Sequence, residues 1–185
     1  MNNHHTSQRD WLTMPNWRDS KELTRAGIVT ALYIVITFAL APISFGPIQF
    51  RLSEALNYTG LYNKRNIYAV TLGVFIVNVY QYGVVDMVVG SFSTYVALLL
   101  GRWLGDLAVE HLTKKQSTWN LTIVRYAILA IVFSLTMFGI AAEFYFLQGL
   151  PFWESYFSLA LSELAAMTVG GIILYTVSRK VDLEK

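Results

Sequence analysis

The sequence of 185 residues contains no cysteine, which excludes disulfide bonds and thiolate metal sites. Charged residues are also scarce, at 14%, whereas soluble domains usually carry about a quarter. The formal net charge of +2 is too small to indicate a nucleic-acid partner. The motifs G-x-x-x-x-G-K-[ST], H-E-x-x-H and G-x-S-x-G are missing. Because no nucleophile can be paired with a base either, we expect a protein that is not an enzyme and needs no metal or cofactor of its own.

Apolar residues make up 55% of the chain and are collected into blocks. The blocks cover residues 26–43, 67–79, 87–101, 126–142 and 159–177. A membrane-spanning helix needs about 20 predominantly apolar residues, and several blocks reach that length once their flanks are added. We interpret the first block as a spanning helix and not as a cleaved signal peptide. The leader before it is long and rich in tryptophan and charge, unlike a short basic n-region.

The positions of lysine and arginine predict the number of membrane crossings, because these residues are retained on the cytoplasmic side. They cluster before the first block, at Lys64 and Arg65, from Lys114 to Arg125, and at the end of the chain. This pattern fits six spans, at residues 24–43, 49–62, 66–80, 84–111, 122–147 and 153–178. We therefore predict an all-α membrane protein, a bundle of six transmembrane helices over residues 24–178. Its two tails, 1–23 and 179–185, would both be cytoplasmic.

Arg51 departs from this pattern, because it falls near the predicted outer face. It belongs to the stretch QFRLSEALNY, in which Glu54 follows at i+3 and therefore lies on the same face of a helix. A charge inside the hydrocarbon costs about 2.5–3.5 kcal/mol on insertion scales, so it usually has a partner or a role. Two interpretations are open: an ion pair that joins helices, or a pair of side chains that faces a ligand.

The outer halves of the other predicted spans carry more polar and aromatic side chains at the same level. These are Asn78, Tyr82, Asp86, Glu143, Phe144, Trp153 and Glu163. Acids, amides and aromatics at one level suit a pocket that opens outward and holds a flat, polar ring. An interfacial belt is the alternative explanation for the aromatics. For Glu163, which lies too deep for the interface, the alternative is a hydrogen bond to a neighbouring helix.

The stretches QFRLSEALN, LYNKRNIYAVTLGVFIVN and GVVDMVVGSFSTYVALLLG carry a resemblance that extends over about residues 24–178. They are similar to the substrate-binding S components of energy-coupling factor (ECF) transporters. The best match among these is the QueT family, which is associated with uptake of queuosine precursors. The resemblance implies six helices in the bacterial cytoplasmic membrane, both termini in the cytoplasm, and a binding site at the outer face.

The resemblance also implies partners and a mechanism. S components do not hydrolyse ATP. They dock through the first span onto a transmembrane coupling subunit (EcfT), which rests on two ATPases, and they topple in the membrane to carry the pocket inward. The docking motif of the family is Ala-x-x-x-Ala, and the matching positions here are Gly27 and Ala31.

The ligand implied by the resemblance is a queuosine precursor, a flat 7-deazaguanine such as preQ1, preQ0 or queuine. Its guanine-like edge presents N–H donors and a carbonyl acceptor. We expect Glu54 or Glu163 to accept hydrogen bonds from this edge. Gln49, Arg51 and Asn78 would orient the ligand or hold those acids.

One precursor also carries an aminomethyl cation, which Asp86 or Glu143 would meet. We expect Tyr82, Phe144 and Trp153 to stack on the ring. Three alternative functions are open: an S component for another vitamin-like or nucleobase-like ring, a passive channel or facilitator, and a structural membrane subunit without a ligand.

Overall fold

The computed structural model describes residues 14–45, 49–81 and 83–183, and within these ranges the chain is helical and contains no strand. This confirms the prediction of an all-α protein. The long helices are α1 (Ser20–Ala39), α4 (Lys64–Gln81), α5 (Val84–Lys114), α6 (Leu121–Gln148) and α7 (Phe152–Ser178). Three short elements precede α4, namely α2 (Ala41–Ser44), the 3-10 helix η2 (Leu52–Tyr58) and α3 (Thr59–Tyr62).

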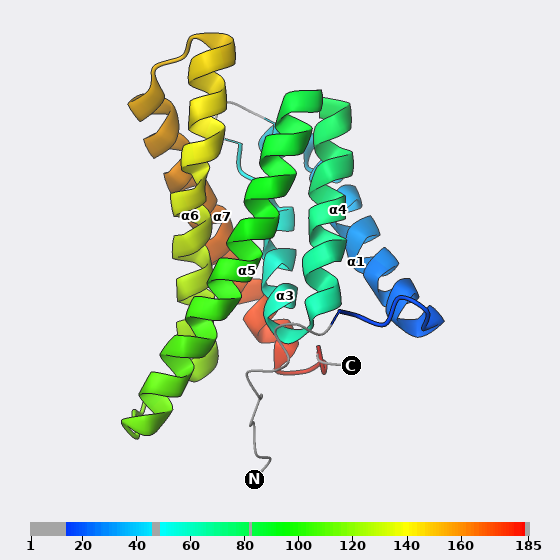
Figure 1. The fold of residues 1–185 in the computed structure, drawn as a ribbon, viewed down its shortest axis with the longest axis vertical. Coiled ribbons are helices and arrows are strands. Elements are labelled where there is room, and N and C mark those ends of the chain that lie inside the picture. Colours follow the sequence, from blue (N-terminus) through cyan, green and yellow to red (C-terminus); the bar gives the residue numbers. More distant parts are fainter. Residues whose placement is uncertain (1–13, 46–48, 82, 184–185) are drawn as a thin grey trace.

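The long helices form one bundle in which successive helices run in alternating directions from α4 onward (Figure 1). α1, α4 and α6 rise from the lower end of the view, and α5 and α7 return to it. Each long helix packs against the next one along the chain. η2 contacts α1, α4 and α7, so this short helix is packed inside the bundle.

Four helices, α1, α5, α6 and α7, are long and apolar enough to cross a membrane. Large apolar side chains are exposed on their outer faces, among them Val35, Phe92, Leu135 and Ile172. The buried side chains include Leu98, Leu129 and Met167, together with many polar residues. An exterior of this kind suits lipid, because it leaves apolar surface where a soluble protein would place charge.

The first predicted span, 24–43, is displaced in the structure. α1 begins at Ser20 because Asp19 caps it, its side chain accepting a hydrogen bond from the Lys21 backbone N–H at 2.9 Å. α1 ends at Ala39, and Pro42 lies in the first turn of α2. A proline in a helix interior has no N–H to donate, which explains why one helix does not continue to residue 43. The later predictions, 66–80, 84–111, 122–147 and 153–178, match α4 to α7 closely.

The segment predicted as a second spanning helix, 49–62, is not one α-helix. Arg51 has an extended backbone, η2 follows as a 3-10 helix, and α3 adds a single α-helical turn. In a 3-10 helix, residues i and i+3 lie directly above one another. Glu54 and Asn57 are therefore stacked on the same side of η2, and both are buried.

Close packing against α7 holds η2 inside the bundle. A Cβ added to Gly170 would lie 2.7 Å from the Cα of Ala55, so the absence of a side chain at Gly170 allows the two backbones to approach. Three residues after Ala55, the hydroxyl of Tyr58 donates to the carbonyl oxygen of Met167 at 2.9 Å. These contacts fix the position of η2 relative to α7.

Candidate ligand pocket

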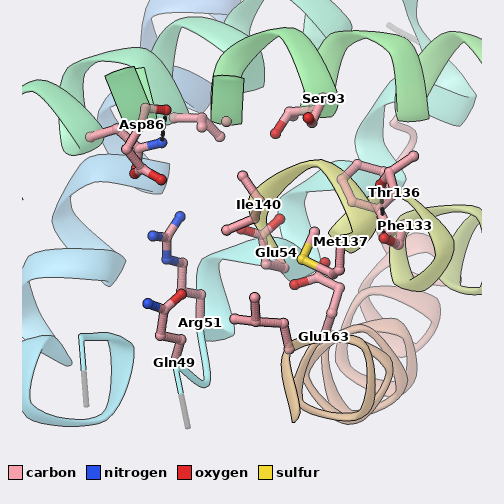
Figure 2. A pocket seen from close by; sticks show the side chains of 15 residues that line it. Gln49, Arg51, Glu54, Asp86, Ser93, Phe133, Thr136, Met137, Ile140 and Glu163 are labelled. Atoms are coloured by element: carbon pink, nitrogen blue, oxygen red, sulfur yellow. Dashed lines mark hydrogen bonds between the residues drawn. The ribbon is translucent and has the colours of Figure 1, made fainter. Parts of the chain in front are cut away.

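A pocket lies near the upper end of the bundle, between the segment Gln49–Glu54 and the upper parts of α4, α5, α6 and α7 (Figure 2). It encloses about 590 Å³ of space not filled by protein, its open mouth included.

Helical spacing brings most of the lining residues together. Each of α4, α5, α6 and α7 contributes residues that recur at intervals of three or four positions, which places them on one face. They are Val74 and Asn78 of α4; Asp86, Gly90, Ser93 and Thr94 of α5; Phe133, Thr136, Met137 and Ile140 of α6; and Leu159 and Glu163 of α7. Gln49, Arg51 and Glu54 complete the lining from the segment that enters η2.

The charged groups of the pocket are three carboxyl groups and one guanidinium. Glu54, Asp86 and Glu163 are each less than one-tenth exposed, at 5%, 7% and 8%. The guanidinium of Arg51 reaches toward Asp86, with Gln49 beside its stem (Figure 2). No group of three histidine, aspartate or glutamate side chains in the described part of the chain is arranged to hold a metal ion. The pocket thus carries more acid than base.

Glu54 is held in place by donors at both of its carboxylate oxygens. The hydroxyl of Tyr33 in α1 donates to Oε1 at 2.6 Å. The side-chain amide of Asn57 donates to Oε2. Hydrogen bonds to a charged acceptor are roughly twice as strong as neutral ones. The orientation of this carboxylate is therefore set before a ligand enters.

Three other acceptors of the pocket are buried without a hydrogen-bond partner among the described residues. They are Oδ1 of Asn78, Oδ2 of Asp86 and Oε1 of Glu163. The amide of Asn78 cannot turn freely, because its Nδ2 donates to the backbone oxygen of Asp86 at 3.1 Å. An unsatisfied buried polar group costs about 1–3 kcal/mol. A ligand that supplied N–H or O–H donors would remove this cost.

Apolar side chains form the remaining wall. Phe133, Met137 and Ile140 of α6 and Leu159 of α7 line the pocket together with the hydroxyl-bearing side chain of Thr136. In Figure 2, Met137 and Ile140 lie across the pocket from Arg51. A pocket with one polar side and one apolar side suits a flat molecule that has a polar edge and an apolar face.

The structure brings six of the predicted site residues into this pocket: Gln49, Arg51, Glu54, Asn78, Asp86 and Glu163. Tyr82 lies outside the described residues. Glu143, Phe144 and Trp153 are not among the lining residues.

The three residues outside the lining have different surroundings. Trp153 is 63% exposed and stacks against Phe157, with ring centroids 6.1 Å apart. Phe144 packs against the small apolar cluster of Ile140, Ala141 and Leu159. Glu143 lies one turn beyond Ile140, and its Oε2 is a buried acceptor without a partner among the described residues.

Several lining residues were not predicted from the sequence, notably Ser93, Thr94, Phe133 and Thr136. A signal for the first two exists, because Ser93 and Thr94 follow Asp86 at i+7 and i+8 and so share its helix face. The pocket face of α6 contains no charged residue, so no such anchor marks Phe133 or Thr136 in the sequence.

Comparison with known proteins gives two matches. Residues 23–180 match the QueT transporter family. A relative described as "Queuosine precursor transporter QueT", from Lactococcus lactis subsp. cremoris (strain MG1363), is 40% identical over 167 residues, which cover 89% of this chain and 96% of the relative. No solved structure matches the chain.

Proposed function

The chain belongs to the QueT transporter family and is a multi-pass protein of the cell membrane, and we propose that it is the substrate-binding S component of an ECF-type importer. It captures a queuosine precursor, a 7-deazaguanine such as preQ1, preQ0 or queuine, at the outer face. It delivers this ligand by toppling in the membrane. The chain itself does not catalyse a reaction, because ATP is hydrolysed by two ATPases beneath the coupling subunit (EcfT).

The ligand assignment is supported by the acceptors that line the pocket without a partner. A guanine-like edge presents several N–H donors, which match Oε1 of Glu163 and Oδ1 of Asn78. The guanidinium of Arg51 supplies the donor that a ring carbonyl needs. The face of a flat ring would lie against Phe133 and Met137.

An aminomethyl cation on the ligand would be balanced by Asp86 of α5, with Glu143 of α6, outside the lining, as a second acid. Asp86 lines the pocket and has a buried oxygen without a partner among the described residues. Glu143 has one as well. Because the lining contains three carboxyl groups and one guanidinium, a cationic ligand brings its charge closer to balance than a neutral ligand does.

The proposed topology has six membrane crossings with both termini in the cytoplasm. The 3-10 helix η2 has 7 residues at about 2.0 Å each and α3 has 4 residues at about 1.5 Å each, so the two together reach about 20 Å of a hydrocarbon core about 30 Å thick. α4 has 18 residues and reaches about 27 Å. These two shorter passages are the proposed second and third crossings, which lie between α1 and α5 in the chain.

Docking on the coupling subunit is assigned to the exposed face of α1. Gly27 and Ala31 are both exposed, and a Cβ added to Gly27 would meet no atom within 4 Å. The opposite face of α1 is buried through Thr30, Tyr33 and Thr37. Small residues on the free face allow another helix to approach closely.

The test is ligand binding by the purified chain and two glutamine variants of α7. Wild type should bind preQ1 saturably at one site and gain thermal stability from it. Glu163→Gln should weaken binding about tenfold or more, because it replaces one of the two carboxyl oxygens by an amide nitrogen that cannot accept a hydrogen bond. Glu154→Gln is the matched control: Glu154 is an exposed acid at the start of the same helix, and its loss should leave the affinity unchanged.

Calorimetric titration and thermal unfolding read out the result. Absence of any preQ1 binding or stabilisation by the wild type would refute the assigned ligand class, and a panel of other ring compounds would then identify the ligand. Equal affinities for wild type and Glu163→Gln would refute the assigned pocket.

A further inference from the structure

The buried face of α1 carries hydroxyl groups that reach into η2. Tyr33 has no exposed surface, and its hydroxyl lies 2.6 Å from Oε1 of Glu54. One turn later, the hydroxyl of Thr37 lies 2.6 Å from the hydroxyl of Ser53. α1 is therefore connected to η2 by hydrogen bonds between side chains at the level of the pocket.

The ring of Tyr33 is tightly enclosed. A Cβ added to Gly73 of α4 would lie 3.0 Å from three carbon atoms of the Tyr33 side chain, so the ring fills the space that the glycine leaves. Buried side chains at this density have little room to change rotamer. The position of the Tyr33 hydroxyl thus follows the position of α1 against α4.

Glu54 lines the pocket, whereas Tyr33 does not. Of the two donors that hold the Glu54 carboxylate, Asn57 belongs to η2 itself and moves with Glu54. Tyr33 is the donor that comes from a long helix. The orientation of the carboxylate relative to the rest of the bundle is consequently set from α1.

We propose that Tyr33 is a positioning residue for ligand binding, which acts through Glu54 and makes the affinity of the pocket depend on the packing of α1. The proposal rests on the proposed function, because it concerns the same pocket and the same ligand. Its consequence is a coupling between the exposed face of α1 and the ligand pocket. The exposed face of α1 carries Gly27 and Ala31, so a partner that displaced this helix would also displace the donor of Glu54.

The experiment is a double-mutant cycle on preQ1 affinity, measured by calorimetry on the purified full chain. Tyr33→Phe keeps the ring and removes the hydroxyl, and it should weaken binding about tenfold, the loss of one bond to a charged acceptor. Glu54→Leu removes the acceptor. On that background, Tyr33→Phe should change the affinity by less than about threefold, because the two residues act as one unit.

Thr30→Val is the matched control, because Thr30 is also buried on α1 and also donates one hydrogen bond to another helix, to the Ala69 oxygen at 2.8 Å. It should leave preQ1 affinity unchanged. If Thr30→Val weakens binding as much as Tyr33→Phe does, or if the effects of Tyr33→Phe and Glu54→Leu simply add, Tyr33 has only a structural role and the proposal is overturned.

Hydrogen exchange on the wild type gives a second measurement that needs no variant. Saturating preQ1 should slow exchange of the α1 amides around Tyr33, and an unchanged α1 would overturn the proposal. Failure of the wild type to bind preQ1 at all would instead refute the proposed function, so the two failures are distinguishable.

Discussion

At the scale of single residues, the pocket is defined by acceptors whose orientation is fixed by hydrogen bonds to neighbouring protein groups. Oδ1 of Asn78 is available for a ligand because the Nδ2 of the same amide donates to the backbone oxygen of Asp86. Glu54 is fixed in the same way by Tyr33 and Asn57. Such preorganisation lowers the cost of ordering the site when a ligand binds.

Gly90 is the residue that leaves room for the Asn78 amide. A Cβ added to Gly90 would collide with Nδ2 of Asn78, so Gly90→Ala should turn the amide away and break its bond to Asp86. We expect preQ1 affinity to fall about tenfold, as measured by calorimetry. Gly27→Ala is the control, because an added Cβ there meets no atom within 4 Å. An affinity for Gly90→Ala equal to that of Gly27→Ala would show that Asn78 does not contribute to preQ1 binding.

At the scale of elements, η2 is the feature on which the site depends, because it places Glu54 inside the bundle. Its buried polar residues, Ser53, Glu54 and Asn57, would be unfavourable on a helix facing lipid. They are acceptable here because α1 and α7 both pack against η2 and supply hydrogen-bond partners, namely the hydroxyls of Tyr33 and Thr37 and the sulfur of Met167.

The contact between η2 and α7 gives a prediction about stability. Gly170→Ala would place a Cβ 2.7 Å from the backbone of Ala55, so η2 would have to shift. Overpacking of this kind costs about 1–3 kcal/mol, which should lower the midpoint of thermal unfolding in detergent. Ala165→Leu adds more atoms to the same helix at an exposed position and should leave the midpoint unchanged. A Gly170→Ala variant as stable as the parent would show that this close approach is not required.

The sequence predicted α5 to α7 well because each is a long apolar block with clear turn residues at its ends, such as Asn120 before α6 and Gly149 after it. It did not predict η2, because the 3-10 geometry follows from packing against α1 and α7 and leaves no periodic signal. The charged and amide residues of the site, such as Arg51 and Glu163, were conspicuous among apolar neighbours. Phe133 and Met137 were not, because an apolar pocket wall looks like any other apolar helix face.

At the scale of the whole molecule, charge separates the two ends of the bundle. Basic residues gather where the helices meet the lower end of Figure 1, whereas Arg51 lies in the pocket: Lys21 is in the first turn of α1, Lys64 and Arg65 are at the start of α4, Lys114 is at the end of α5, and Arg179 follows α7. The pocket lies toward the other end. Under the positive-inside rule, this distribution supports the proposed orientation, in which the lower end faces the cytoplasm and the pocket opens to the outside.

The central claim, an outward-facing pocket that holds a deazaguanine, is tested most directly by cysteine labelling, because the natural chain contains no cysteine. Ser93→Cys places a thiol in the pocket, and Thr118→Cys places one in the connection between α5 and α6 at the lower end. In intact cells, a membrane-impermeant maleimide should label Ser93→Cys, and preQ1 should slow that labelling. Thr118→Cys should be labelled only after the membrane is permeabilised, and preQ1 should not change its labelling rate. Labelling of Ser93→Cys from the cytoplasmic side alone, or at a rate that preQ1 does not change, would contradict the account.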